Sequence, residues 1–336
     1  MSGRLLSLDA FRGLTIAGMV LVNNPGTWAA VYPPLRHAEW HGLTPTDVVF
    51  PFFLFIVGMA IPLARPSFGR VLRRAAVIGA LGLVLNAAWG FDPATLRIPG
   101  VLQRIAVCYL VAALLFLTTS WRTQAIVTAA LLLGYWGVMH GDLSPEGNLA
   151  ARLDRAVLGP HILRLTRVYD PEGILSTLPA IATTVLGVLA GRWVRNARAT
   201  AGGVALAGAI GVGLGAAWSL VFPLNKSLWT SSYVVLTAGL ALLVFAACYW
   251  AIEIRGWRRW ATPFVVLGVN ALALFFLSTL AAVVLIRSGA HKVVYQSLFA
   301  PWAAPVNASL AFAVAYLLVW WGVMWGFSRA GIRLRA

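Results

Sequence analysis

Apolar runs of about twenty residues recur along almost the whole chain, and they constrain its fold more than any other feature. Each run is long enough for a helix that crosses a bilayer, where the backbone must satisfy its own hydrogen bonds. Of the 336 residues, 60% are hydrophobic and 11% are charged, whereas an ordinary soluble domain carries about 25% charged residues. These proportions exclude a soluble globular fold.

The sequence predicts an all-α polytopic membrane protein with about ten transmembrane helices. Ten spans of about 20 residues use roughly 200 positions, so we expect residues 1–336 to form one transmembrane domain without a separate soluble domain. The expected spans are residues 12–31, 47–64, 71–90, 100–118, 122–140, 174–191, 202–222, 230–252, 262–286 and 307–327.

The distribution of charge predicts the orientation of these spans. The net charge is +16, from 26 basic and 10 acidic residues. With both termini in the cytoplasm, sixteen of the 26 basic residues lie in inner segments, among them Arg4 and Arg12 at one end and Arg333 and Arg335 at the other. This asymmetry follows the positive-inside rule, so no nucleic-acid partner is needed to explain it. We expect a multi-pass protein of the inner (cytoplasmic) membrane.

The groups suited to acid–base chemistry concentrate in the predicted first outer loop. His37 is a candidate because an imidazole can transfer protons at neutral pH, although a solvated loop histidine explains this residue equally. His37 and His41 flank Glu39 at a spacing that could bind a metal on a helix, but no third ligand is identifiable, so no metal is expected. Thr44 and Asp47 fit a helix start, a role compatible with orienting a histidine.

Asn23 lies inside or at the end of the first expected span. An amide in lipid is costly without a partner, so we expect Asn23 to face the interior of the bundle. An ordinary hydrogen bond between helices would explain it as well as a functional role.

Further polar residues stand near the predicted outer ends of later spans. Arg97 and Arg104 are seven residues apart, which is about two turns if both lie on a helix. Arg104 would then lie within the membrane and need an acid or a bound anion as partner. The other clusters supply Glu172 from 169–173, Asn225, Lys226 and Trp229 from 223–230, and Asn270 from the ninth span. From these residues alone, an enzyme and a transporter fit equally well.

Several of these motifs, taken in order, closely resemble one known family. They are residues 4–13 (RLLSLDAFRG), Val22-Asn23, residues 37–51 (HAEWHGLTPTDVVFP), and segments 97–104, 169–175 and 223–229. Together they resemble the membrane domain of the heparan-α-glucosaminide N-acetyltransferase family and its bacterial NagX-type relatives. The resemblance covers nearly the whole chain.

This resemblance implies a transmembrane N-acetyltransferase that moves acetyl from cytosolic acetyl-CoA to the amine of an extracytoplasmic amino sugar. His37 matches the family's catalytic histidine, which would act as a base or as an acetyl carrier. Asn23 matches the asparagine beside that histidine, and Asp47 matches an acid after the histidine loop. Glu39 or Asp47 could orient the imidazole. Glu39, His41, Arg97, Arg104, Glu172, Asn225, Lys226, Trp229 and Asn270 are the expected substrate-binding residues. Arg12, Arg73 and Arg74 are expected to bind the CoA phosphates.

The chain also departs from the lysosomal pattern. His41 replaces an asparagine, residues 25–27 replace a glycine-rich stretch, and the N-terminal luminal domain is not expected. These departures leave the acceptor sugar open. A homodimer is a further possible assembly. The alternative function is a transporter of amino sugars or chito-oligosaccharides without acyl-transfer chemistry.

Overall fold

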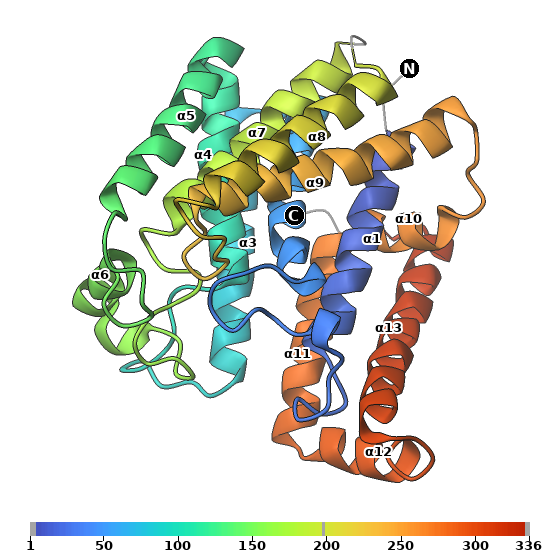
Figure 1. The fold of residues 1–336 in the computed structure, drawn as a ribbon. Coiled ribbons are helices and arrows are strands. Elements are labelled where there is room, and N and C mark those ends of the chain that lie inside the picture. Colours follow the sequence, from blue (N-terminus) through green and yellow to red (C-terminus); the bar gives the residue numbers. More distant parts are fainter. Residues whose placement is uncertain (1–4, 197–198, 333–336) are drawn as a thin grey trace.

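The computed structural model describes residues 5–196 and 199–332, and within these ranges it contains helices and loops without any strand (Figure 1). The all-α fold class is therefore confirmed. Arg4, Arg198, Arg333 and Arg335, which entered the charge argument, lie outside the described residues.

Eight helical segments are long and apolar enough to cross a membrane among the residues that the structure describes. They contain α1 (Leu6–Asn23), α2 (Val49–Ala64), α3 (Phe68–Ala88), α4 (Val101–Thr118), α7 (Thr177–Arg195), α8 (Ala201–Trp218), α9 (Ser231–Tyr249) and α13 (Pro305–Arg329). A ninth is the pair α10 (Thr262–Val269) and α11 (Ala271–Arg287), which is bent by 79° at Asn270. The fifth expected span, 122–140, forms α5 (Trp121–Val138), whose polar first turn makes it less apolar than these segments.

Hydrogen bonds connect the predicted outer ends of these helices to one another at one end of the bundle, which we call the loop end. Asn86 near the end of α3 donates to the Arg97 carbonyl before α4 (2.7 Å), and Tyr135 near the end of α5 donates to the Leu228 carbonyl before α9 (2.5 Å). Ser309 in the first turns of α13 donates to the Thr27 carbonyl after α1 (3.1 Å). The chain therefore alternates in direction, as the charge pattern predicts.

The opposite end, which we call the terminal end, holds both ends of the described chain. The Ser7 amide donates to Glu253 after α9 (3.1 Å), and Asn270 donates to the Ile332 carbonyl (3.2 Å). An even number of passes through the bundle follows from this arrangement. Which end faces the cytoplasm remains a prediction.

Helices α2 and α7 pack closely enough to bring their backbones into contact. A Cβ at Gly58 would lie 2.0 Å from the Thr184 carbonyl oxygen, and one at Gly187 would lie 2.1 Å from that of Phe55. Small residues allow this approach between helices in membranes. This contact fixes α2, and with it the short turn that carries Asp47, against the centre of the bundle.

The first expected span was misplaced. Helix α1 begins at Leu6 and ends at Asn23, because Pro25 cannot continue a helix and Gly26 packs against Tyr295. Arg12 therefore lies within α1 and not before it. Two short amphipathic helices were also not predicted: α6 (Leu149–Leu158) and α12 (Ala290–Leu298). Figure 1 shows α12 across the lower ends of α11 and α13.

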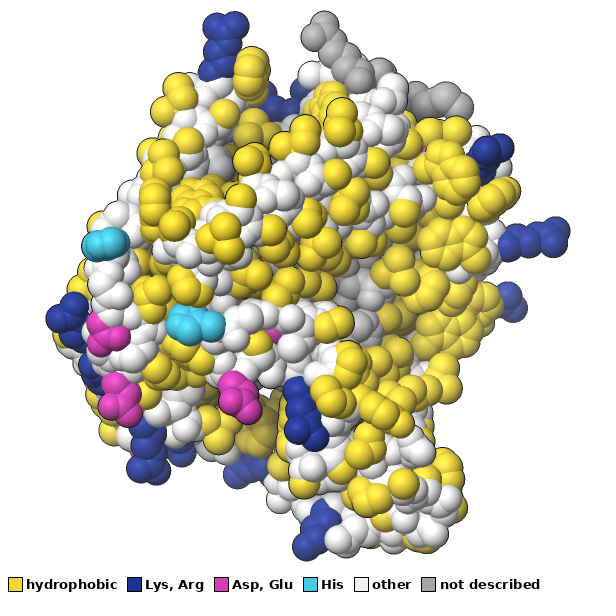
Figure 2. All heavy atoms as spheres, in the orientation of Figure 1, with side chains coloured by type: hydrophobic (Ala, Val, Ile, Leu, Met, Phe, Trp, Pro, Cys, Tyr) yellow, Lys and Arg dark blue, Asp and Glu magenta, His cyan; other side chains and the backbone are white. Residues whose placement is uncertain are grey.

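On the face of the molecule in Figure 2, charged and apolar side chains occupy different regions. Its acidic and histidine side chains gather at the lower left, over α6 and the loops beside it, whereas the helical band above is largely hydrophobic. This distribution fits a bundle whose middle contacts lipid and whose loop end contacts water.

Candidate active site

The loop that holds His37 is fixed by two short 3-10 turns, Pro33–Leu35 and Pro45–Val48. The predicted helix start is confirmed, because Thr44 and Asp47 form a reciprocal capping box at the second turn. The segment between the turns is not helical, so His37 and His41 do not share one helical face. Within residues 5–196 and 199–332, no cluster of three His, Cys, Asp or Glu side chains could hold a metal.

Asp47 binds and orients His37. Its Oδ1 lies 2.6 Å from His37 Nδ1, while its Oδ2 accepts from the amides of Ala38 (3.0 Å) and Thr44 (3.1 Å). An ionised carboxylate only accepts hydrogen bonds, so Nδ1 carries the proton and Nε2 carries the lone pair. Asp47 is 1% exposed and His37 is 43% exposed, so a buried carboxylate orients an accessible imidazole.

Lys226 brings a primary amine against this pair. Its Nζ lies 3.0 Å from His37 Nδ1, 3.3 Å from Nε2 and 3.7 Å from Asp47 Oδ1. Burial lowers the pKa of Lys226 below its ordinary value, and the nearby charge of Asp47 opposes this shift. The site therefore accommodates an amine beside the imidazole, which the sequence did not reveal.

The loop of residues 223–230 holds Lys226 in this position through backbone contacts. The Gly42 amide donates to the Leu224 carbonyl (2.8 Å), which ties this loop to the histidine loop. Asn225 is fully buried; its Oδ1 accepts from the Leu228 amide (2.8 Å) and its Nδ2 lies 3.4 Å from His41 Nδ1. Partial burial lowers the pKa of His41. Asn225 therefore shapes the loop and is not exposed to a substrate.

Trp229 was expected to bind substrate, but only 1% of it is exposed. Its indole donates to Thr183 Oγ1 (3.0 Å), and its ring packs edge-on against Phe50 and Tyr233. Tyr233 in turn donates to the Asp47 carbonyl (2.6 Å), a contact that sequence reasoning missed because nothing in the local pattern of α9 marks it. Trp229 and Tyr233 therefore support the turn that contains Thr44 and Asp47.

Arg97 joins the loop before α4 to the loop before α7. Its guanidinium binds Asp170 in a bidentate pair (2.9 and 2.6 Å) and also contacts Glu172 (2.6 Å). Although burial acts to lower the pKa of Arg97, these carboxylates raise it above its ordinary value. Helix α4 begins at Val101, so Arg97 precedes it and the two arginines do not lie on one helix.

Arg104 is 2% exposed, as expected for a buried cation, but its direct partners are not acidic. Its Nη2 donates to the Gly173 carbonyl (3.2 Å) and to Ser176 Oγ (2.5 Å), and the guanidinium lies over the Trp229 ring (5.2 Å). Nη2 meets neutral oxygens because the loop before α7 folds back over the start of α4. Nε and Nη1 are buried without a hydrogen-bond partner among the described residues, so a bound anion stays a prediction. Arg104 therefore braces this loop.

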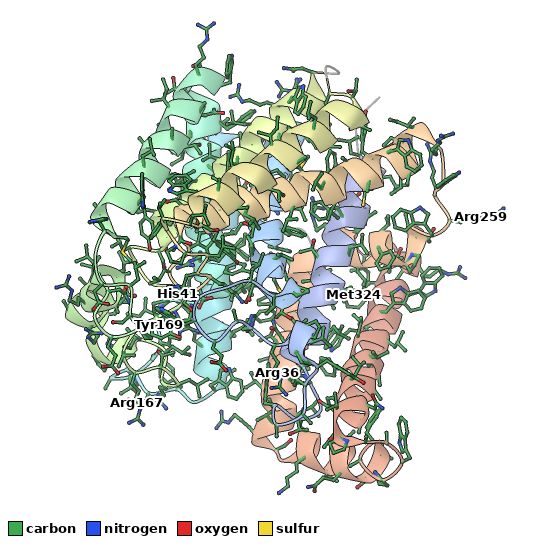
Figure 3. The ribbon with its side chains drawn as sticks, viewed as in Figure 1. Arg36, His41, Arg167, Tyr169, Arg259 and Met324 are labelled. Carbon is green, nitrogen blue, oxygen red and sulfur yellow. The ribbon has the colours of Figure 1, made fainter. Side chains whose placement is uncertain are left out.

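Asn23 and Glu39 are both exposed. The expectation that Asn23 faces the bundle interior was wrong, because α1 ends there and the side chain lines a cavity of about 1010 Å³ at the loop end. Glu39 does not replace Asp47 as the orienting acid, since Asp47 makes the contact with His37. Figure 3 shows His41 and Tyr169 near each other beside this loop, with Arg259 far away between α9 and α10.

The remaining expected residues lie apart from His37. Asn270 sits at the bend before α11 and lines a terminal-end cavity of about 660 Å³ with Leu6 and Ile332. Arg12 pairs with Asp9 on α1 (3.0 Å). On α3, Arg73 is exposed and Arg74 lies over the Tyr109 ring (5.0 Å). No contact draws the three arginines into one phosphate site within the described chain.

The fold defines a multi-pass helical membrane protein, and its loop end carries a histidine held by a buried carboxylate, an arrangement that can perform acid–base chemistry. The chain belongs to the family described as heparan-alpha-glucosaminide N-acetyltransferase, catalytic, whose profile matches residues 4–209.

Two curated relatives are similar to most of the chain. Heparan-alpha-glucosaminide N-acetyltransferase of Homo sapiens is 30% identical over 352 residues, which cover 81% of this chain and 52% of the relative. The protein of the same name from Mus musculus is 29% identical over 354 residues, with 82% and 53% covered. The chain thus spans about half the length of the curated relatives that it matches.

Proposed function

We propose that this protein is an N-acetyltransferase that moves the acetyl group of acetyl-CoA to the amine of an amino sugar, with a glucosamine-type acceptor. The observation that carries the proposal is the contact of a primary amine, Lys226 Nζ, with an imidazole that Asp47 orients. An acceptor amine at this position would lie at the edge of the imidazole, 3.3 Å from Nε2, the nitrogen that carries the lone pair.

The chemistry follows from the protonation states. An ammonium is not a nucleophile, so a base must remove its proton before it attacks the thioester. His37 Nε2 is the lone-pair nitrogen, and the hydrogen bond to Asp47 stabilises the imidazolium that forms. The same nitrogen could carry the acetyl group in a two-step route, with CoA leaving as the thiol.

Asn23 is proposed to donate to the developing oxyanion, an effect of about 3 kcal/mol at comparable sites. Support for this role is its exposed amide at the loop end, which is also the end of His37. We further propose that acetyl-CoA comes from the cytosol, that the acceptor lies outside the inner membrane, and that the terminal end faces the cytoplasm. The charge asymmetry supports this orientation.

The test is acetyl transfer by purified full-length protein in detergent, followed as CoA thiol released from acetyl-CoA in the presence of glucosamine. His37→Ala should lower the rate at least about 10²-fold, since loss of a general base typically costs 10²–10⁴-fold. His41→Ala is the matched control and should lower it less, because His41 contacts Asn225 and not Asp47. Transfer that persists in His37→Ala would refute the mechanism. Glucosamine uptake by vesicles without thiol release would instead identify a transporter.

A further inference from the structure

The amine of Lys226 occupies the position beside the imidazole at which an acceptor amine would react. The chain has two lysines, Lys226 and Lys292. Lys226 Nζ lies 3.0 Å from His37 Nδ1 and 3.3 Å from Nε2, whereas Lys292 is exposed on α12. The protein therefore carries its own primary amine at the group proposed to remove a proton from the acceptor.

The loop of residues 223–230 holds this amine in place. The Asn225 carbonyl accepts from the Thr230 amide (3.1 Å), and the Lys226 carbonyl accepts from the Trp229 amide (3.1 Å), so the backbone on both sides of the lysine side chain is fixed. The side chain of Lys226 is 24% exposed. Reagents that reach His37 can therefore also reach Nζ.

The surroundings of Lys226 favour a reactive, neutral amine. Burial lowers its pKa, against the opposing charges of Asp47 and Glu172. Asp47 Oδ1 is 3.7 Å from Nζ, which is longer than a hydrogen bond, and Glu172 is bound by Arg97 at 2.6 Å. Lys226 is thus neutral more often than an exposed lysine, and His37 Nε2 lies close enough to take the proton of the charged form.

The distance between these groups suits acyl transfer. Reacting atoms in a productive complex lie about 3–3.5 Å apart. Nζ is 3.3 Å from His37 Nε2, and the four-carbon stem of a lysine is flexible, so Nζ can reach an acetyl carbon that is bound to Nε2 or held beside it. The acceptor amine needs the same position, so the acceptor and Lys226 compete for the acetyl group.

We propose that Lys226 is a self-acetylation site, to which the protein transfers acetyl when no acceptor is bound. This inference rests on the proposed function, which supplies acetyl-CoA and the base. Nζ forms a bond to the acetyl carbon, and the bond from that carbon to the CoA sulfur breaks, or the bond to His37 Nε2 in the two-step route. The leaving sulfur or nitrogen keeps the electron pair. The amine gives its proton to His37 Nε2, and CoA leaves as the thiol.

Acetylation would change the site in two ways. It replaces the charged amine of Lys226 with a neutral amide, which removes the interaction with Asp47 at 3.7 Å. It also leaves an acetamide group beside His37, where the acceptor amine must enter. Acetyl-Lys226 would therefore stop further transfer by the modified molecule.

The experiment follows label from acetyl-CoA into the protein. Purified full-length protein in detergent is incubated with acetyl-CoA that carries ¹³C in its acetyl group, without glucosamine. Hydroxylamine then removes acetyl from imidazole and thioester but not from the amide of acetyl-lysine, and digestion with peptide mass spectrometry locates the label. The variants are His37→Ala, Lys226→Arg and, as the matched control, Lys292→Arg.

We expect Lys226 to gain label at least about tenfold faster than Lys292 in the same sample, because only Lys226 is held beside the base. His37→Ala should slow the labelling of Lys226 at least about 10²-fold. Lys226→Arg should leave the peptide unlabelled, since a guanidinium stays protonated. Lys292→Arg should label Lys226 as the wild type does.

Equal labelling of the two lysines would overturn the inference, because uncatalysed acetylation would then explain both. Labelling of Lys226 that persists in His37→Ala would overturn it for the same reason. An unlabelled Lys226 in protein that transfers acetyl to glucosamine would overturn the inference and leave the proposed function standing. Conversely, labelling of Lys226 that depends on His37, without any transfer to glucosamine, would support self-acetylation and refute the proposed acceptor.

Discussion

The substitution Asp47→Asn tests the proposed site at the atom that orients His37. The carboxylate accepts four hydrogen bonds, one from His37 and three from Ala38 N, Thr44 N and Thr44 Oγ1. An asparagine has one acceptor oxygen. Three donors already converge on the position of Oδ2, so the amide oxygen takes that position and the NH₂ group faces the imidazole.

This exchange reverses the histidine tautomer. The amide NH₂ can only donate to His37 Nδ1, which moves the proton to Nε2 and removes the lone pair that the reaction needs. The corresponding Asp→Asn change in a Ser-His-Asp triad costs about 10⁴-fold in rate. We expect a loss of about 10³–10⁴-fold in acetyl transfer by the same reasoning.

Asp47→Asn should lower the free energy of unfolding only slightly. A hydrogen bond to a charged group contributes about 1.5–3 kcal/mol, and His37 is 43% exposed, so water replaces part of it and the lower end applies. The variant should therefore fold and retain acetyl-CoA binding. The assays are thiol release, thermal unfolding in detergent and titration with acetyl-CoA.

Asp142→Asn is the matched control, because Asp142 is an exposed acid that accepts from the Ser144 amide at the loop end. It should transfer acetyl at the wild-type rate. If Asp47→Asn keeps activity within about threefold of wild type, the tautomer argument fails, and the contact with Asp47 serves only to hold the loop.

Three further outcomes follow from the structure. Burial raises the pKa of Asp154 to about 6, so its contribution to stability is fully present below about pH 4 and is lost as the pH rises through 6. Thermal unfolding of Asp154→Asn should show a smaller decline over that interval, and an unchanged decline would refute the assignment. Gly58→Ala should destabilise the bundle by about 3 kcal/mol or more, because its Cβ would lie 2.0 Å from the Thr184 carbonyl oxygen. Gly134→Ala, whose Cβ meets nothing within 4 Å, should be neutral or stabilising in the same unfolding measurement. A reporter fused after Arg335 should give a cytoplasmic signal; a periplasmic signal would contradict the orientation drawn from the charge asymmetry.

The local sequence was sufficient to predict the structure of a segment wherever one physical requirement dominates that segment. Apolar length predicted the helices, because a backbone in lipid has almost no other way to satisfy its hydrogen bonds. The charge pattern predicted their alternation. The capping box of Thr44 and Asp47 could also be predicted, since a cap depends on residues three positions apart.

The end of α1 shows where such reasoning failed. Apolar residues before and after Asn23 extended the expected span to residue 31, although Pro25 and Gly26 end the helix first. The same error placed Asn23 inside the bundle. Hydropathy averages over a window of residues, so it cannot locate a break that single residues impose.

Only the tertiary structure decided which polar groups meet. Lys226 contacts His37 across 189 positions of sequence, Arg97 contacts Asp170 across 73, and Tyr233 contacts the Asp47 carbonyl across 186. Sequence spacing carries no information about such pairs, because they depend on how the helices pack and not on any periodicity within them. The sequence by itself determined a helical membrane bundle with a histidine loop. Packing determined that Asp47 orients His37 and that the amine of Lys226 lies against the imidazole. Packing also determined that Arg104 and Trp229 support the site from the interior of the bundle.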